Sequence, residues 1–315
     1  MIINKLELEK SELTISDAIQ DFVQNLTPQY SEGEARSIAR LVFEDYFNLK
    51  STSENDEMLF QSFLKEDYES IKAQILRGVP VQYVLGFAWF YGIKFKVNNS
   101  VLIPRPETEE LVEWVLETIN ALKNIENPLK IIDIGTGSGC IPIILKIKNP
   151  SLEVTAIDVS ESALITASRN AARHNVSVDF KRIDILNEDD WVPMTQSVMA
   201  RSALISHFDI IISNPPYIPH AEKALMEDNV LSHEPHLALF VDDDNPLVFY
   251  EKIADFAIKH GSFPLKTNAQ RLLFFECNEF NAYEVVSMLH KKGFENIELK
   301  KDMSGKDRMI KAVWK

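Results

Sequence analysis

Four short apolar segments in the second half of the chain constrain its fold most strongly. They span residues 130–134, 153–157, 177–183 and 208–213. Apolar runs of this length are typical of strands that are buried on both faces of a parallel sheet. Helical stretches separate the first three segments, so we expect parallel strands joined by crossover helices. The connection over residues 187–207 is longer and more polar, and the sequence does not predict its structure.

The C-terminal region adds three more strands to this pattern. Residues 271–277 are predicted to form a fifth strand, and a helix follows over 280–292. Two further strand-like runs, 295–300 and 308–314, are joined by a polar turn and predict a terminal hairpin. We therefore expect an α/β fold with a mostly parallel seven-stranded sheet whose last two strands form an antiparallel hairpin.

The first eighty residues have a helical texture. Ser31-Glu32-Gly33-Glu34 has the form of a capping box, and a later helix near residues 68–77 stops at Gly78-Val79-Pro80. Apolar and charged residues then alternate over 93–97, which is the period of a strand. These patterns predict a small helical domain at 1–80, a linking β-hairpin at 81–103 and a larger α/β domain at 104–315.

Charge and composition narrow the classes of partner. The chain has 33 Lys+Arg against 47 Asp+Glu, a net charge of −14, and no basic run, so we expect no direct contact with nucleic acid. The first residues lack the layout of a signal peptide, and no apolar stretch reaches the roughly 18 residues of a membrane span. Cys140 and Cys277 are predicted to be buried, reduced thiols, so we expect a cytoplasmic protein that does not bind membranes. No zinc-binding pattern is present, and we expect no metal.

A glycine-rich turn follows the first predicted strand, as Gly135-Thr136-Gly137-Ser138-Gly139. Alternate glycines let a strand-to-helix turn pass close to a ligand with its N–H groups facing that ligand. Asp158 ends the next strand, 158 − 139 = 19 residues beyond the last glycine. This is close to the roughly 20 residues expected for a carboxylate that binds ribose hydroxyls, so we expect a nucleoside-containing ligand.

The spacing of these glycines bears on which nucleoside binds. The pattern is G-x-G-x-G with Asp133 just before it, whereas dinucleotide sites have G-x-G-x-x-G. It resembles motif I of S-adenosylmethionine (AdoMet) methyltransferases. In that class the neighbourhood of Asp184, after the third strand, holds the adenine. The alternative for Asp184 is a carboxylate that only stabilises a turn.

A second motif, Asn214-Pro215-Pro216-Tyr217, directly follows the fourth strand. Two consecutive prolines fix the backbone and remove two donors, so carbonyl oxygens there are rigid acceptors. The Asn214 side-chain oxygen and the Pro215 carbonyl can each accept one N–H of a planar NH₂ group, and Tyr217 can stack on its flat face. The alternative is a loop that the prolines merely stiffen.

The chemistry of a planar NH₂ group explains why such rigid acceptors are needed. An amide nitrogen is a poor nucleophile because resonance worth roughly 18–20 kcal/mol delocalises its lone pair. Hydrogen bonds to both N–H groups aim that lone pair, and orientation alone contributes about 7–11 kcal/mol to such a step. Fixed carbonyl dipoles also stabilise positive charge on the nitrogen, so no catalytic histidine is required.

With these segments, the chain resembles the HemK/PrmC family, which N5-methylates the glutamine of the Gly-Gly-Gln loop in class I peptide-release factors. The matching segments are Gly78–Gly86, Phe90–Gly92, Leu102–Glu109, Gly135–Gly139, Asn214–Pro219, Glu234–Leu239 and Ser304–Arg308. The resemblance implies a Rossmann-like class I fold, AdoMet as the cofactor and class I release factors as partners. It assigns AdoMet binding to Gly135, Thr136, Gly137, Ser138, Gly139, Asp158, Asp184, Ile185 and Asn214. It assigns glutamine binding to Asn214, Pro215, Pro216 and Tyr217, with Asn214, Pro215 and Tyr217 catalytic.

Two segments depart from the family pattern, and three other functions remain open. Residues 240–246 lack the usual Gly-rich acidic stretch, and 276–280 lack the usual glycine-containing turn. The closest rival is an adenine-N6 or guanine-N2 methyltransferase of nucleic acid, which the net charge disfavours. An NAD-dependent dehydrogenase is disfavoured by the glycine spacing. A noncatalytic binding module would keep the ligand pocket without turnover.

Overall fold

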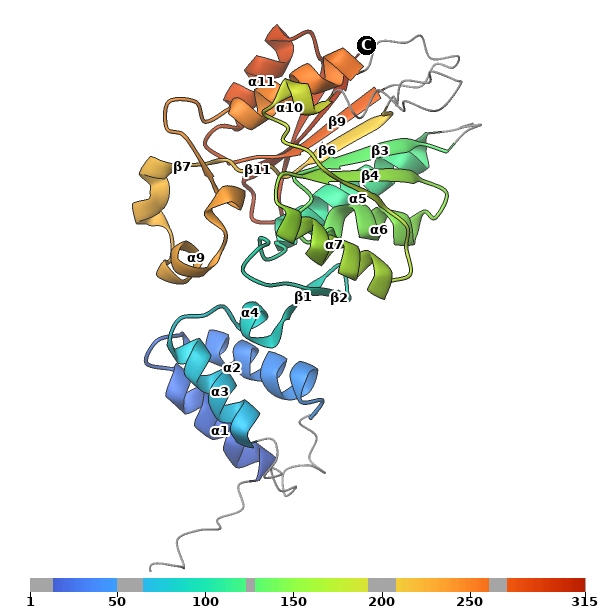
Figure 1. Cartoon of the computed structure of the whole chain (residues 1–315). Coiled ribbons are helices and arrows are strands. Elements are labelled where there is room, and N and C mark those ends of the chain that lie inside the picture. Colours follow the sequence, from blue (N-terminus) through green and yellow to red (C-terminus); the bar gives the residue numbers. More distant parts are fainter. Residues whose placement is uncertain (1–13, 50–64, 123–127, 192–207, 261–270, 315) are drawn as a thin grey trace, which may run out of the picture. The chain divides into compact units, whose positions relative to one another are not determined.

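The computed structural model describes residues 14–49, 65–122, 128–191, 208–260 and 271–314. The chain divides into two compact units between Gly86 and Phe87. Figure 1 shows both units coloured along the sequence. Among the described residues, no helix combines the length and the apolar character that crossing a bilayer requires.

The first unit is helical, as predicted. Its elements are α1 (Ile15–Leu26), α2 (Glu32–Arg40), the π-helix η1 (Leu41–Tyr46), α3 (Lys65–Leu76) and α4 (Val81–Leu85). The Ser31 side chain caps α2 by accepting from the N–H of Glu34. Aromatic rings from three helices form the centre of the unit, where Phe22 packs edge-on against Phe43 and both rings contact Tyr68.

The predicted β-hairpin is shorter than expected. Residues 81–85 form helix α4 instead, and the hairpin consists of β1 (Phe87–Phe90) and β2 (Ile93–Lys96). The helix is favoured because Val81 and Leu85, four residues apart, are both buried on one face, and Gly86 ends it at a positive φ of 75°. In the hairpin, Phe90 and Phe95 pack into the core of the second unit.

The second unit contains the predicted seven-stranded sheet. Its strands are β3 (Lys130–Ile134), β4 (Glu153–Asp158), β5 (Asp179–Arg182), β6 (Ile210–Ser213), β9 (Arg271–Glu276), β10 (Glu295–Lys301) and β11 (Asp307–Trp314). The order is β10-β11-β9-β6-β3-β4-β5. All pairs among β9, β6, β3, β4 and β5 are parallel, and β11 is antiparallel to both β9 and β10. The expected Rossmann-like class I architecture is therefore confirmed.

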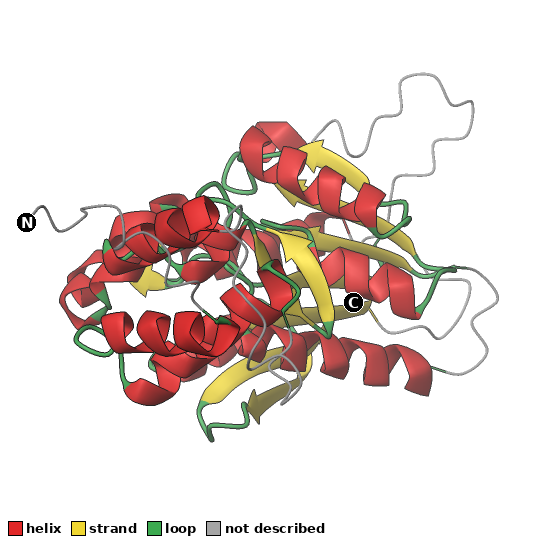
Figure 2. Ribbon diagram, turned by 90° about the horizontal axis from the view of Figure 1, so that it is seen from below, coloured by secondary structure: helices red, strands yellow, loops and turns green. Residues whose placement is uncertain are grey.

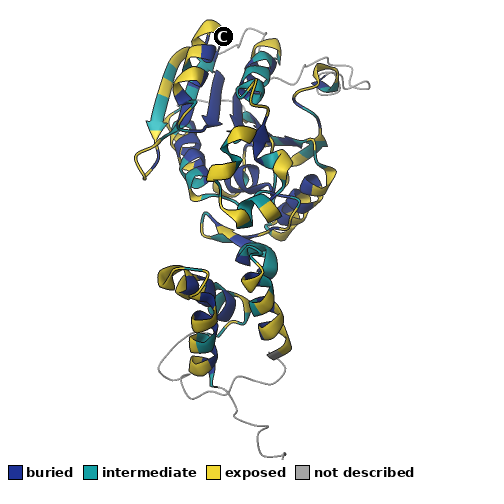
Figure 3. Ribbon diagram, turned by 90° about the vertical axis from the view of Figure 1, so that its left-hand side faces the viewer, coloured by how far each residue is buried: buried dark blue, intermediate teal, exposed yellow. Residues whose placement is uncertain are grey.

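Helices cover both faces of this sheet (Figures 1 and 2). One face carries α5 (Pro106–Ala121), α6 (Cys140–Lys148) and α7 (Glu161–Arg173), and the other carries α10 (Val248–His260) and α11 (Ala282–Lys291). Successive strand residues alternate between two cores, since Ile131 belongs to the first and Ile132 to the second. The central strands are accordingly buried (Figure 3). Both cysteines are free and buried, as expected.

Short elements fill the remaining connections. Between β6 and α10 the chain forms β7 (Ile218–Pro219), η4 (His220–Leu225), α9 (Asp228–His233), η5 (His236–Ala238) and β8 (Phe240–Val241). In the connection that the sequence left open, residues 188–191 form the 3₁₀ helix η3 with Trp191 buried, and 192–207 lie outside the described residues. Within the departure at 240–246, Asp242, Asp243 and Asp244 are exposed, and Asp243 accepts the N–H of Ala221.

Candidate active site

The carboxyl ends of the parallel strands converge on one edge of the sheet. Loops that leave β3, β4, β5 and β6 line a cavity of about 380 Å³ there, which we call the sheet-edge cavity. Such an edge is where open α/β sheets bind ligands. The predicted residues that line this cavity are Gly135, Gly137, Asp158, Asp184, Ile185, Asn214, Pro215 and Pro216.

The glycine-rich turn contributes its backbone to the wall of this cavity. Gly135 and Gly137 both have positive φ, at 75° and 55°, and a Cβ on either would meet no atom within 4 Å. The N–H of Gly137 donates to Asp158 Oδ2 at 2.9 Å. This bond joins the loop after β3 to the end of β4 and gives the turn a fixed shape.

The other three residues of the turn do not line the cavity. Thr136 and Ser138 are buried, and the Ser138 carbonyl accepts a hydrogen bond from the Asn170 side chain at 2.8 Å. At Gly139, φ is 79° and a Cβ would come within 3.0 Å of the Ala167 Cβ. This glycine therefore permits the start of α6 to pack closely against α7.

Two carboxylates face the sheet-edge cavity. Asp158 accepts the N–H of Gly137 through Oδ2 and the N–H of Ser160 through Oδ1, and burial raises its pKa. Asp184 accepts the N–H of Leu186 at 2.9 Å, so it also stabilises its own turn, as the alternative reading of this residue proposed. The two aspartates give an otherwise largely apolar cavity a negative character.

Asp133, on β3, is the most deeply buried acidic group near the glycine turn. It is 0% exposed, and among the described residues neither carboxylate oxygen has a hydrogen-bond partner. Burial raises its pKa to about 7; the nearby Thr136 hydroxyl opposes this shift, and the charge of Asp158 adds to it. A buried carboxylate without a partner costs folding free energy, and burial therefore favours the neutral form of Asp133.

The segment Asn214–Tyr217 separates two cavities. Besides the sheet-edge cavity, a second one of about 310 Å³ lies against this segment, and we call it the side cavity. Both cavities are lined by Asn214 and Pro215, and Leu102 and Ala238 also line both. Tyr217 lines only the side cavity. Asn214 and Pro215 therefore stand at the junction of two spaces.

The orientation of the Asn214 side chain follows from its partner. Its Nδ2 donates to Thr108 Oγ1 at 3.1 Å, and the Thr108 hydroxyl donates to Glu276 Oε2 at 2.7 Å. Since the threonine hydrogen is directed at a carboxylate, its oxygen can serve Asn214 only as an acceptor. The amide nitrogen of Asn214 must therefore face Thr108, which turns its oxygen toward the rest of the site.

Several residues of the site were missed by the sequence analysis. Thr108 and Glu276 have the contacts just described, and an ion pair of 2.6 Å joins Arg105 to Glu234, whose side chain is 1% exposed. Glu234 also accepts the N–H of Ile103. Family segments 102–109 and 234–239 contain four of these five residues, which was the available signal. Five other residues line the sheet-edge cavity but had no signal in the sequence: Asn99, Ser100, Val101, Phe249 and Ile253.

Known proteins that resemble this chain indicate its class. A family model described as the methyltransferase small domain matches residues 116–236. The crystal structure of the hMettl16 catalytic domain with a MAT2A 3'UTR hairpin shares the fold, at a TM-score of 0.52 and 14% identity over 88% of this chain and 91% of that one. The N-terminal domain of human METTL16 with SAH has a TM-score of 0.50, also at 14% identity, over 88% and 93%. Fold and site together define a class I methyltransferase.

The relatives identify the family within that class. The chain is 42% identical to the release factor glutamine methyltransferase of Flavobacterium psychrophilum, over 92% of this chain and 96% of the relative. It is 34% identical to that of Bacteroides thetaiotaomicron over the same shares, and 34% identical to that of Streptococcus pneumoniae over 95% and 98%. The chain belongs to the release factor glutamine methyltransferase family.

Proposed function

We propose that this protein transfers the methyl group of AdoMet to the side-chain amide nitrogen of the glutamine in the Gly-Gly-Gln loop of class I peptide-chain release factors. One observation carries the proposal: the sheet-edge cavity and the side cavity meet at Asn214 and Pro215. A methyl donor in the first cavity and a glutamine side chain in the second would both reach the same two residues. Group transfer requires this proximity.

The lining of the sheet-edge cavity suits AdoMet chemically. Asp158 keeps acceptor capacity for ribose hydroxyls, while Ile183, Ile185 and Phe249 offer apolar surface to the adenine. AdoMet, when bound, supplies a methyl group on a positively charged sulfur. Asp158 and Asp184 place negative charge at the cavity wall, which suits a cationic group.

Asn214 and Pro215 would hold the acceptor nitrogen. With its own amide nitrogen bound to Thr108, Asn214 presents its side-chain oxygen to one N–H of the substrate amide, and the Pro215 carbonyl accepts the other. Two acceptors held in fixed positions align the nitrogen lone pair with the methyl carbon and stabilise positive charge on the nitrogen. The bond from nitrogen to carbon forms as the carbon–sulfur bond breaks, with the electron pair left on sulfur. The amide proton then passes to water.

The helical unit would dock the protein substrate, because none of its described residues lines either cavity. Tyr68 and Lys72 both bind Asp21 in an ion-paired cluster within the helices. A nucleic-acid substrate is disfavoured by the net charge of −14. The likeness to RNA-bound hMettl16, at 14% identity, extends to the fold alone.

The direct test is to incubate the full chain with AdoMet and a class I release factor, and to localise any added methyl by mass spectrometry. We expect one methyl on the glutamine of the Gly-Gly-Gln loop. A release factor with that glutamine changed to alanine is the matched control, and DNA and RNA substrates run in parallel. Methyl transfer to nucleic acid and none to the release factor would reject the proposal.

A further inference from the structure

The acidic residue that ends β9, Glu276, lies next to the start of the Asn214–Tyr217 segment. Strands β6 and β9 pair in parallel with Ser213 opposite Phe275, so the following residues, Asn214 and Glu276, leave the sheet side by side. Glu276 is 1% exposed. A carboxylate removed from water needs partners, and the identity of these partners indicates what it does.

The carboxylate of Glu276 reaches both ends of the segment. Oε2 accepts the hydroxyl of Thr108, which in turn accepts the side-chain N–H of Asn214. Oε1 lies 3.5 Å from the hydroxyl of Tyr217, at the long limit of a hydrogen bond. A single side chain is thus connected to the first and the last residue of the motif, through helix α5 in one case and directly in the other.

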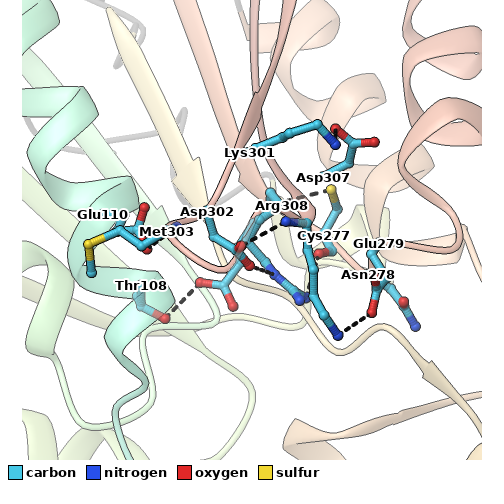
Figure 4. Close-up of polar contacts among 12 residues, drawn as sticks. Thr108, Glu110, Cys277, Asn278, Glu279, Lys301, Asp302, Met303, Asp307 and Arg308 are labelled. Carbon is cyan, nitrogen blue, oxygen red and sulfur yellow. Dashed lines mark hydrogen bonds and ion pairs between the residues drawn. The ribbon is translucent and has the colours of Figure 1, made fainter.

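The surroundings hold Glu276 in place. The Tyr250 hydroxyl on α10 donates to its backbone carbonyl at 3.2 Å. On β11, Arg308 donates to the carbonyl of the next residue, Cys277, and is itself paired with Asp302 (Figure 4). The family segment 304–308, which the proposed chemistry does not use, therefore supports the turn that follows Glu276.

We propose that Glu276 is a positioning residue, which holds Asn214 through Thr108, and Tyr217 directly, in the geometry that binds the substrate amide. This inference rests on the proposed function. Burial raises the pKa of the Glu276 carboxyl to about 7. Whether it is ionised or protonated on Oε1, the carboxyl accepts the Thr108 hydroxyl through Oε2, and Thr108 can then only accept from Asn214. The side-chain oxygen of Asn214, rather than its NH₂, consequently faces the substrate N–H groups.

Two nearly isosteric variants test this chain of hydrogen bonds. Thr108→Val removes the hydroxyl, and we expect kcat for release-factor methylation to fall about tenfold to hundredfold, as for a misplaced reacting group. AdoMet affinity, measured by calorimetry, should change less than about twofold, since Thr108 itself does not line the sheet-edge cavity. Glu276→Gln keeps an acceptor for Thr108 and should retain kcat within about threefold, whereas a general-base role would lose most of it.

Further variants separate positioning from folding. Glu276→Ala should lower kcat as Thr108→Val does, and the double variant should be no slower than the slower single one within about twofold, because both changes break one chain. Cys277→Ala is the matched control, since this buried neighbour contacts Arg308 and not Asn214. It should leave kcat unchanged.

Two results would overturn the inference. The first is that the wild-type enzyme is active and the Thr108→Val variant keeps kcat within about twofold of it. A change that small is expected when a contact is lost without moving Asn214. The second is that the losses of kcat in the Thr108→Val and Glu276→Ala variants multiply in the double variant. If the wild-type chain methylates no release factor, the proposed function fails instead. The position of the Asn214 side chain in crystals of Thr108→Val then decides the inference, and an unchanged Asn214 contradicts it.

Discussion

The side chain of Asn214 donates to Thr108 Oγ1 across 3.1 Å, although the two residues are 106 positions apart in the chain. Thr108 lies in the first turn of α5, and Asn214 follows β6. Their contact determines which end of the Asn214 amide faces the site.

Replacing Asn214 with alanine should remove one of the two acceptors for the substrate amide. We expect kcat to fall about a hundredfold to a thousandfold, the loss seen when one preorganised polar group is removed from a transition state. Methyl transfer to a release factor measures this loss, and calorimetry with AdoMet should show binding that is largely retained. Turnover that survives the substitution contradicts the catalytic assignment of Asn214.

Asp158→Ala should weaken AdoMet binding. A hydrogen bond to a charged group contributes about 1.5–3 kcal/mol, so we expect the dissociation constant to rise about tenfold to hundredfold. Asp184→Ala is the informative comparison, because Asp184 lines the same cavity but the ribose hydroxyls are assigned to Asp158. It should have the smaller effect. If the order is reversed in calorimetric titrations, the ribose assignment of Asp158 is wrong.

Arg105→Ala should destabilise the fold through Glu234. The two side chains are 2.6 Å apart, and 1% of the Glu234 side chain and 33% of the Arg105 side chain are exposed. The substitution therefore leaves a buried carboxylate without its cation. We expect the free energy of unfolding to fall by about 2–3 kcal/mol, discounted from the value for fully buried pairs because Arg105 is partly exposed. Urea titration measures this change.

The control for Arg105 is an exposed pair. Arg36 and Glu32 on α2 also lie within 2.7 Å, but both side chains are about two-thirds exposed. Arg36→Ala should cost less than about 0.5 kcal/mol. Equal losses for the two arginine variants would show that burial of Glu234 has no energetic consequence.

Asp133→Asn should change how stability depends on pH. Burial raises the pKa of Asp133 to about 7 from 3.8, so the folded state binds its proton more tightly than the unfolded state does. The contribution of Asp133 to stability is therefore complete below about pH 4 and is lost as the pH rises through 7. Asparagine does not titrate, so the variant should gain stability relative to wild type between pH 5 and pH 8, an interval of about three units around the shifted pKa.

Thermal or urea unfolding at both pH values measures this difference for Asp133. AdoMet must be absent, because a bound cation would stabilise the ionised carboxylate and lower its pKa. A constant difference between variant and wild type across the interval would mean that Asp133 stays ionised throughout.

Much of the fold follows from local sequence. The apolar strands, the glycine turn and the prolines at 215 and 216 specify backbone geometry within a few neighbouring residues, and the structure has all seven predicted strands. Residues 81–85 were the exception. They were predicted as part of the hairpin, but burial of Val81 and Leu85 on one face favours a helical turn.

The residues that orient the Asn214 side chain could not be found from local sequence. Glu276 ends β9, where a segment that departs from the family pattern begins, and nothing in its local sequence relates it to Thr108 or Asn214. Only the parallel pairing of β6 with β9, and the packing of α5 beside them, bring these three side chains together.

The sequence by itself determined which chemical groups this protein offers: a glycine turn with an aspartate for a nucleoside, and two rigid acceptors for a planar NH₂. The tertiary structure alone decided how Asn214 is oriented and which carboxylates are deprived of water. The reason is physical. Backbone conformation depends on near neighbours, whereas hydrogen-bond direction and burial depend on side chains brought together from distant parts of the chain.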